Sequence, residues 1–321
     1  MAPVTVTSAT PTRSVALLLG LALSIVACDR GAASSEPSEA ADATAKAAEP
    51  DAPYLDRRSA HETQLSAHTP SPAKGAPLTS APPGAVTVTY TSGELGLQAW
   101  VGYPSRAGSK PALIYFHGDF AIGPDDFEAV RPFLDAGFLV MTPSLRGENG
   151  NPGDFELLWG EVDDARAAVE WVASQPGVDR NRIYAFGHSI GGGIAAMLSL
   201  YPELPLRATG SCGGIYVPET FERWANSEAN AELVRFDASD PRETTLRVLG
   251  PNLPWMVHPH LAYVGDDDEW FITNAEALQA RAWEQGQPFE MIRVPGDHMG
   301  SLAPSLEAFL RLSSAPAWTP N

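Results

Sequence analysis

The chain has 321 residues and a formal net charge of -18, with 39 acidic side chains against 21 basic ones. This excess of negative charge repels phosphate backbones, so nucleic acid is excluded as an expected partner. The length suits one large α/β domain or two small ones, and hydrophobic residues, at 44%, are enough for a sizeable core.

The first residues are typical of an export signal. Arg13 precedes an apolar run over residues 15–27 that is too short to span a bilayer comfortably. The run ends in Ile25-Val26-Ala27-Cys28, which resembles a bacterial lipobox, the motif in which the cysteine is lipidated. The resemblance implies cleavage of residues 1–27 and anchoring through Cys28 to a bacterial membrane, on the periplasmic face or the cell surface. An ordinary secretory signal with a coincidental cysteine is the alternative.

Cysteine usage is consistent with this interpretation. The sequence contains two cysteines, Cys28 and Cys212. If Cys28 carries lipid, no intramolecular disulfide can form. Cys212 is then predicted to be a small core residue.

Residues 28–84 are predicted to be a disordered tether. They are rich in Ala, Pro, Ser and Glu and contain few large apolar residues. They show no hydrophobic period of 2 or 3.6 residues, so they cannot bury enough surface to offset the entropy of ordering.

Strands and helices are expected to alternate in a folded domain over residues 85–313, followed by a tail over 314–321. Two alternating stretches, 86–90 and 97–103, are separated by a turn and predict an antiparallel hairpin. Continuous apolar runs predict buried strands, and runs with a helical period predict helices. The further strands are expected over 112–117, 138–142, 183–186, 208–211, 260–264 and 289–294, and the helices over 124–135, 159–174, 194–201, 274–285 and 301–312. This order predicts an α/β fold with a mostly parallel, doubly wound sheet and helices on both faces.

One motif stands between a strand and a helix. Gly187-His188-Ser189-Ile190-Gly191 matches G-x-S-x-G, directly after the strand expected over 183–186 and before the helix expected over 194–201. In a nucleophile elbow, the serine occupies a sharp, strained strand-to-helix turn that exposes its hydroxyl. Because both flanks are those that the turn requires, Ser189 is predicted to be a nucleophile.

A nucleophilic serine needs a base, a carboxylate that orients the base, and donors for the oxyanion. After a G-x-S-x-G serine, the acid and the histidine follow downstream, each beyond the end of a strand. The acidic loop 265–269 follows one late strand, and His298 follows the last one. His298 is the only histidine after that loop, and it is therefore the predicted base.

The chain resembles the serine hydrolases of the α/β-hydrolase fold, especially their prolyl-oligopeptidase-like and dienelactone-hydrolase-like branch. The resemblance covers about residues 85–313, and the motifs that carry it are His117-Gly118, Arg146-Gly147, Asp179-Arg180-Asn181-Arg182-Ile183, Gly187 to Gly193, Gly265-x-x-Asp268 and His298. In that branch the acid is the aspartate of a G-x-x-D turn, which implies Asp268. Asp266 and Asp267 are the alternatives.

The oxyanion donors are expected to be two backbone N–H groups. One should belong to Ile190, the residue after the nucleophile. The family's His-Gly-x pattern implies Asp119 as the other. An acidic residue at this position is unusual, because its charge opposes that of an oxyanion.

Aromatic side chains are common in the pockets of such enzymes. The candidates for the substrate pocket are Phe120, His188, Trp224, Trp255 and Trp270. The segment 215–257 mixes aromatic and polar residues at a place where this fold accepts insertions, so it is a candidate lid. An excursion packed on the far side of the sheet is the alternative. No cluster of His, Cys and carboxylate residues has metal-ligand spacing, so neither a metal nor a cofactor is expected.

These features predict a serine hydrolase that cleaves carboxylic esters through an acyl-enzyme, with Ser189 as nucleophile, His298 as base and Asp268 as orienting acid. One alternative is a serine peptidase of the prolyl-oligopeptidase-like type without a propeller. The other is a non-catalytic binding lipoprotein that retains the fold. The expected ligand is a small ester or a peptide, and the sequence does not indicate an oligomeric state.

Overall fold

The computed structural model describes residues 51–73, 75–105 and 107–315. The expected signal peptide, the lipidation site Cys28 and the expected tether before residue 51 lie outside the described residues, as does most of the expected tail. Within the described ranges, no helix is long and apolar enough to cross a membrane.

A single sheet positions the rest of the fold. Its strands are β1 (Ala85–Ser92), β2 (Leu95–Gly102), β3 (Lys110–Phe116), β4 (Leu139–Pro143), β5 (Val178–His188), β6 (Leu206–Cys212), β7 (His260–Gly265) and β8 (Phe289–Val294). They lie in the order β1-β2-β4-β3-β5-β6-β7-β8. β2 pairs antiparallel with both β1 and β4, and all the other pairs are parallel. The predicted mostly parallel sheet with an N-terminal hairpin is confirmed.

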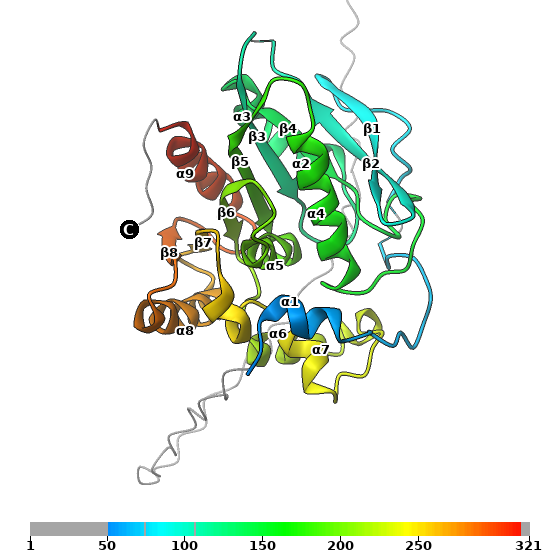
Figure 1. Cartoon of the computed structure of the whole chain (residues 1–321), viewed down its shortest axis with the longest axis vertical. Coiled ribbons are helices and arrows are strands. Elements are labelled where there is room, and N and C mark those ends of the chain that lie inside the picture. Colours follow the sequence, from blue (N-terminus) through cyan, green and yellow to red (C-terminus); the bar gives the residue numbers. More distant parts are fainter. Residues whose placement is uncertain (1–50, 74, 106, 316–321) are drawn as a thin grey trace, which may run out of the picture. The chain divides into compact units, whose positions relative to one another are not determined.

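Helices cover both faces of this sheet (Figure 1). They are α1 (Tyr54–Ser59), α2 (Pro124–Ala129), α3 (Arg131–Asp135), α4 (Gly160–Ala173), α5 (Ile190–Met197), α6 (Pro218–Ala225), α7 (Pro241–Thr245), α8 (Glu269–Gln285) and α9 (Leu302–Ser314), with the 3-10 turns η1 (Leu198–Leu200), η2 (Ala231–Leu233) and η3 (Gly250–Trp255). Buried residues of α4, α5 and α8 belong to one core cluster, and those of α2, α3 and α9 belong to another.

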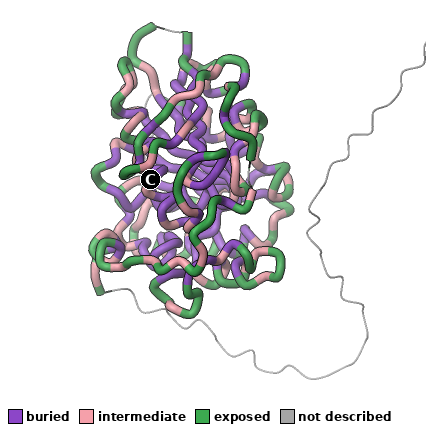
Figure 2. Tube along the Cα trace, turned by 90° about the vertical axis from the view of Figure 1, so that its right-hand side faces the viewer, coloured by how far each residue is buried: buried purple, intermediate pink, exposed green. Residues whose placement is uncertain are grey.

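The burial of strand β3 on both faces explains why its sequence is a continuous apolar run. Ala112, Ile114 and Phe116 belong to the cluster of α4, α5 and α8, whereas Leu113 and Tyr115 belong to the opposite cluster. Successive side chains of a strand point to opposite faces, so both faces of β3 are buried and neither tolerates polar residues. Figure 2 shows the buried residues of the domain as a whole gathered in its interior.

The helix expected over residues 124–135 is two short helices, α2 and α3, interrupted at Val130. In a continuous helix, residue 132 would donate its N–H to the carbonyl of Glu128. Pro132 has no N–H and its ring clashes with that carbonyl, so the continuous helix is excluded.

The expectation of a disordered tether is wrong for the described residues between 51 and 84. Helix α1 buries Tyr54 completely, and Leu78 is also buried. Much of the remaining contact is polar: Ser66 N–H donates to the carbonyl of Arg235, and the carbonyl of Thr69 accepts from Phe155 N–H. The composition indicated disorder because the segment has few large apolar residues to bury. The segment is also ordered by hydrogen bonds to the folded domain, which composition does not reveal.

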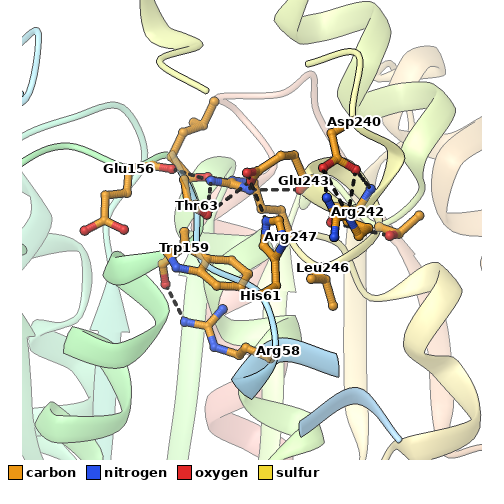
Figure 3. A network of polar contacts seen from close by, with 12 residues as sticks. Arg58, His61, Thr63, Glu156, Trp159, Asp240, Arg242, Glu243, Leu246 and Arg247 are labelled. Carbon is orange, nitrogen blue, oxygen red and sulfur yellow. Dashed lines mark hydrogen bonds and ion pairs between the residues drawn. The ribbon is translucent and has the colours of Figure 1, made fainter. Parts of the chain in front are cut away.

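The segment 215–257 packs against this N-terminal segment. Figure 1 shows α1, α6 and α7 gathered below α5. Phe221 and Phe236 are buried in the core, with their rings stacked at 6.4 Å. Figure 3 shows the polar contacts between the two segments, in which Arg247 and Glu243 of one meet Thr63 of the other.

Candidate active site

The turn between β5 and α5 has the geometry of a nucleophile elbow. Ser189 has φ 53° and ψ -116°, a conformation that a residue with a side chain rarely adopts. A Cβ on Gly187 would lie 1.9 Å from the carbonyl oxygen of Gly191, and one on Gly191 would lie 2.3 Å from that of Phe116. Glycine at both positions is therefore required for the close approach of strand and helix.

An aspartate and a histidine meet beside this turn. His298 Nδ1 lies 2.9 Å from Asp268 Oδ2, and the Phe271 ring stacks on the imidazole at 4.3 Å between centroids. Asp268 immediately follows the turn after β7, and His298 lies in the loop after β8. A carboxylate that accepts from Nδ1–H holds the imidazole in the tautomer whose Nε2 accepts a proton.

The other two aspartates of this turn face elsewhere. Asp266 accepts from Arg293 Nε at 3.0 Å, and its side chain is half-exposed. Asp267 is exposed, and its backbone N–H donates to the carbonyl of Gly296. Of the three consecutive aspartates, Asp268 is the one that meets His298.

The ends of β5 and β6 bring Ser189 and His298 near each other. Ser189 N–H donates to the carbonyl of Cys212 at 2.8 Å. The next residue, Gly213, lies against the imidazole: a Cβ there would lie 2.7 Å from His298 Nδ1. Among the described residues, no hydrogen bond joins the Ser189 hydroxyl to the imidazole. This contact is often long in serine hydrolases without substrate.

His188 links two loops of the site. It is buried, its Nε2 lies 3.1 Å from the carbonyl oxygen of His298, and a Cβ on Gly118 would lie 2.7 Å from its Nδ1. Burial and, secondarily, the nearby His298 lower the pKa of His188 to about 4. The ring is therefore neutral at neutral pH, and its Nε2–H can donate to the His298 carbonyl.

The two expected oxyanion donors border one cavity. Ile190 is the first residue of α5, so its N–H has no acceptor within the helix. Asp119 is exposed and has φ 63°, in the left-handed region. In the described part of the chain, its N–H donates no backbone hydrogen bond. Both N–H groups are thus available to a ligand.

An ion pair lies beneath the loop that carries Asp119. His117 Nε2 lies 3.0 Å from Glu148 Oε2, and both side chains are buried. Burial alone would lower the pKa of His117, but the Glu148 carboxylate outweighs it and raises the pKa to about 9. The raised pKa favours a protonated His117 at neutral pH, whose charge is paired with the Glu148 carboxylate.

The cavity is small, with a volume of ≈ 10 Å³. It is lined by His117, Asp119, Phe120, Leu145, Glu148, Phe155, Leu157, Leu158, Glu161, Ile190 and Ile194. Of the five pocket candidates, Phe120 lines it, whereas none of the residues 215–257 does. The segment 215–257 belongs to the core cluster of α4, α5 and α8, so it is not packed on the far side of the sheet, and a lid over the active site stays a prediction.

The three tryptophan candidates lie away from this cavity. Trp270 packs on Phe271, which in turn stacks on His298. Trp224 packs near Phe221 in the core. Trp255 lies 5.1 Å from the guanidinium of Arg57 in α1, and α1 also meets Tyr201, which follows the 3-10 turn η1. Trp224 and Trp255 are partly buried and pack against the core, and a role for them in a substrate pocket stays a prediction.

Sequence reasoning missed Phe155, Leu157, Leu158 and Glu161, which lie between β4 and the first turn of α4. Leu157 and Leu158 are buried although both have positive φ, 52° and 63°. This stretch has no hydrophobic period, so no signal in the sequence indicates that it forms a wall of the cavity. Burial raises the pKa of Glu161 to about 7, against the opposing effect of Arg146.

Arg146 makes ion pairs with Asp164 and Glu156, which agrees with a structural role in its loop. In the part of the chain that the structure describes, no three His, Cys or carboxylate side chains are grouped so that they could hold a metal ion.

Two family models match the chain, each over more than half of its length. The model of the X-Pro dipeptidyl-peptidase (S15 family) matches residues 33–216, and the model of the prolyl oligopeptidase family matches residues 126–309. The two matches overlap on the elbow and together extend over the whole sheet.

Curated relatives cover part of the chain. The uncharacterized peptidase YtmA of Bacillus subtilis (strain 168) is 30% identical over 118 residues, which are 35% of this chain and 44% of that protein. An uncharacterized protein of Mycobacterium tuberculosis is 30% identical over 144 residues, which are 43% of this chain and 51% of that protein. The chain thus spans about half the length of these relatives.

Solved structures share the fold at low identity. A dipeptidyl peptidase 4 of Porphyromonas gingivalis is 17% identical with a TM-score of 0.60, over 71% of this chain and 35% of that one. A puromycin-hydrolyzing peptidase of Mycobacterium tuberculosis is 20% identical with a TM-score of 0.61, over 71% and 39%. Esterase 2 of Thermogutta terrifontis is 19% identical with a TM-score of 0.55, over 74% and 94%.

Proposed function

This chain belongs to the serine peptidase families of the X-Pro dipeptidyl-peptidase (S15) and prolyl oligopeptidase type, and from that premise we propose that it hydrolyses carboxylic esters through Ser189. The family makes it a serine hydrolase of the α/β-hydrolase fold. The observation that carries the proposal is the hydrogen bond between His298 Nδ1 and Asp268 Oδ2, beside the strained turn of Ser189.

The proposed reaction has two halves. The Ser189 hydroxyl attacks the acyl carbonyl while His298 Nε2 takes its proton, and Asp268 stabilises the resulting imidazolium. The backbone N–H groups of Ile190 and Asp119 donate to the oxyanion. His298 then protonates the leaving alcohol, and water, activated by the same imidazole, releases the acid from Ser189.

A peptide substrate is the second candidate, and the names of the matched families favour it. The cavity beside the two donors bears on the size of the acyl group, which esters and peptides both carry, so it does not decide between the two. Parallel assays with p-nitrophenyl esters and aminoacyl anilides decide between the two.

The proposal predicts a single catalytic unit. Ser189→Ala and His298→Ala should each lower kcat on the order of 10⁴–10⁶-fold, and the double variant should be little worse than either one. A fluorophosphonate probe should label Ser189 in the wild type and not in Ser189→Ala. Additive losses would show that the two residues act independently. An unlabelled Ser189 with no turnover would favour the binding lipoprotein.

We also propose export and membrane anchoring through Cys28, supported by the lipobox-like Ile25-Val26-Ala27-Cys28. Mass spectrometry of the N-terminus of the chain purified from a bacterial membrane checks this proposal. A mature N-terminus other than a lipidated Cys28 would contradict it.

A further inference from the structure

The cavity lies on one side of the position that the substrate carbonyl would occupy. It is bordered by Ile190 and Asp119, whose N–H groups are the proposed oxyanion donors, and no residue of the loops that carry Asp268 and His298 lines it. The leaving group must lie beside His298, because this residue protonates it. The acyl group points away from the leaving group and is therefore the substituent on the side of the cavity, which begins at Ile190, the neighbour of Ser189.

The walls of the cavity leave little space. A volume of ≈ 10 Å³ is about the room that one water molecule needs, and a methyl group is of similar size. Phe120 and Phe155 close part of the wall with their rings at 5.4 Å and nearly perpendicular. Leu157 and Leu158 are buried on the same wall.

The N-terminal segment holds both phenylalanines. Ser71 Oγ donates to the carbonyl of Phe120 at 2.5 Å, and Phe155 N–H donates to the carbonyl of Thr69 at 3.0 Å. Arg235 donates to the carbonyls of Thr69 and Pro70, at 2.6 and 3.0 Å, and its guanidinium lies 5.2 Å from the Phe155 ring centroid. The three consecutive residues 69–71 thus connect Phe120 with Phe155, the two aromatic residues of the cavity wall.

A second set of contacts holds the leucine wall through Arg247, which Figure 3 shows beside Thr63. Arg247 Nε donates to the carbonyl of Leu157 at 2.9 Å, and Arg247 Nη2 donates to the Thr63 hydroxyl at 3.2 Å. Because Leu157 and Leu158 have unfavourable positive φ, surrounding contacts must hold them in place.

From this geometry we infer that the cavity is the acyl site, that it takes acetyl-sized groups, and that residues 69–71 set this limit. The inference rests on the proposed function and names its substrate class: esters of acetic acid or of an acid of similar size. Ser71 acts as a positioning residue, since it contacts the loop of the oxyanion donor and not the substrate.

The test compares acyl chain lengths in the full chain. Wild-type kcat/KM should be on the order of 10–200-fold higher for p-nitrophenyl acetate than for the butyrate, the usual discrimination of a pocket against added methylenes. Phe155→Ala should enlarge the cavity and reduce this ratio at least about tenfold. Phe221→Ala is the matched control, because Phe221 is a buried phenylalanine that does not line the cavity.

Ser71→Ala tests the N-terminal segment without removing a wall. It should reduce the acetate-to-butyrate ratio, and Ser71→Thr, which keeps a hydroxyl, should restore it. A purely structural role of Ser71 would lower the melting temperature and leave the ratio unchanged, which would overturn the role of residues 69–71. Equal ratios for Phe155→Ala and Phe221→Ala would overturn the wall assignment.

Assays of the wild type distinguish a failure of this inference from a failure of the proposed function. A wild type that cleaves the butyrate as fast as the acetate overturns the acyl-site inference and leaves the ester hydrolase intact. A wild type that is not labelled at Ser189 and cleaves no ester overturns the proposed function, and this inference with it.

Discussion

Two aspartates two positions apart, Asp266 and Asp268, have different surroundings after β7. Asp268 is largely buried and bonds His298 Nδ1, whereas Asp266 is half-exposed and pairs with Arg293. A carboxylate in the position of Asp268 orients the base and stabilises its protonated form. A surface ion pair such as that of Asp266 contributes little to either activity or stability.

Asp268→Asn should therefore lower kcat by about 10⁴-fold, because the amide no longer accepts from the histidine N–H in the required tautomer. Asp266→Asn is the matched control and should change kcat by less than about threefold, as expected for an exposed pair. Steady-state kinetics on acetate esters measures both. If Asp266→Asn is the damaging change, the orienting acid is misassigned.

Individual residues differ in how far sequence could identify them. Ser189 and His298 were recognisable because each stands in a motif at a strand end. The acid was open among three adjacent aspartates, since a shift of one residue in a turn changes which side chain faces the histidine. Ser71 and Phe155 carried no signal, because only tertiary packing brings them together at the cavity.

At the scale of elements, the short helix α7 carries a fully buried arginine just beyond its end. Arg247 pairs with Glu243 one turn earlier, and Glu243 also meets His61 of the N-terminal segment. Arg242 of the same helix is exposed and pairs with Asp240 (Figure 3). The two arginines offer a direct comparison of a buried and an exposed ion pair.

Arg247→Ala should lower the free energy of unfolding by about 3–5 kcal/mol, because it leaves Glu243 buried without its cation. Arg242→Ala should lower it far less, because the ion pair of Arg242 is exposed to solvent. Denaturant unfolding of the two variants measures the difference. Equal effects would show that the buried network contributes no more than the surface pair.

The long elements were predictable and the short ones were not. Strands β3 to β8 and helices α4, α8 and α9 have clear apolar runs or helical periods, and all occur near their expected positions. Helices α6 and α7 have eight and five residues, too few for a period to stand out. No helix was therefore expected within the segment 215–257.

At the scale of the whole molecule, a buried neutral histidine makes stability depend on pH. His260 is completely buried, with its two ring nitrogens 2.8 Å from the hydroxyls of Thr209 and Ser211. Burial lowers its pKa to about 3. The unfolded chain binds a proton at this residue near pH 6.5. Between those values the unfolded state holds more protons, so acid favours unfolding.

The contribution of His260 is full above about pH 6.5 and is lost as the pH falls towards 3, by at most about 1.4 kcal/mol per pH unit. Glu161, whose pKa is raised to about 7, opposes it between about pH 4.5 and 7, because its native state holds the proton. His260→Gln should therefore flatten the loss of stability between pH 6 and pH 4.5, relative to the wild type. Parallel slopes in denaturant unfolding would contradict this.

Fold class was predictable for the molecule as a whole, because strand and helix signals alternate over a long stretch. The N-terminal boundary of the folded domain was not predictable. Residues 54–71 have the composition of a tether, and their order depends on partners far away in the sequence, such as Arg235 and Leu246.

The attachment of α1 also has a consequence for how the chain folds during synthesis. The Tyr54 hydroxyl donates to the carbonyl of Leu246, which lies 192 residues later. A ribosome adds about 5–20 residues per second, so roughly 10–40 s pass between the synthesis of Tyr54 and that of this partner. Over that interval the Tyr54 hydroxyl lacks this acceptor. The first part of the domain to be made is thus among the last to be fixed.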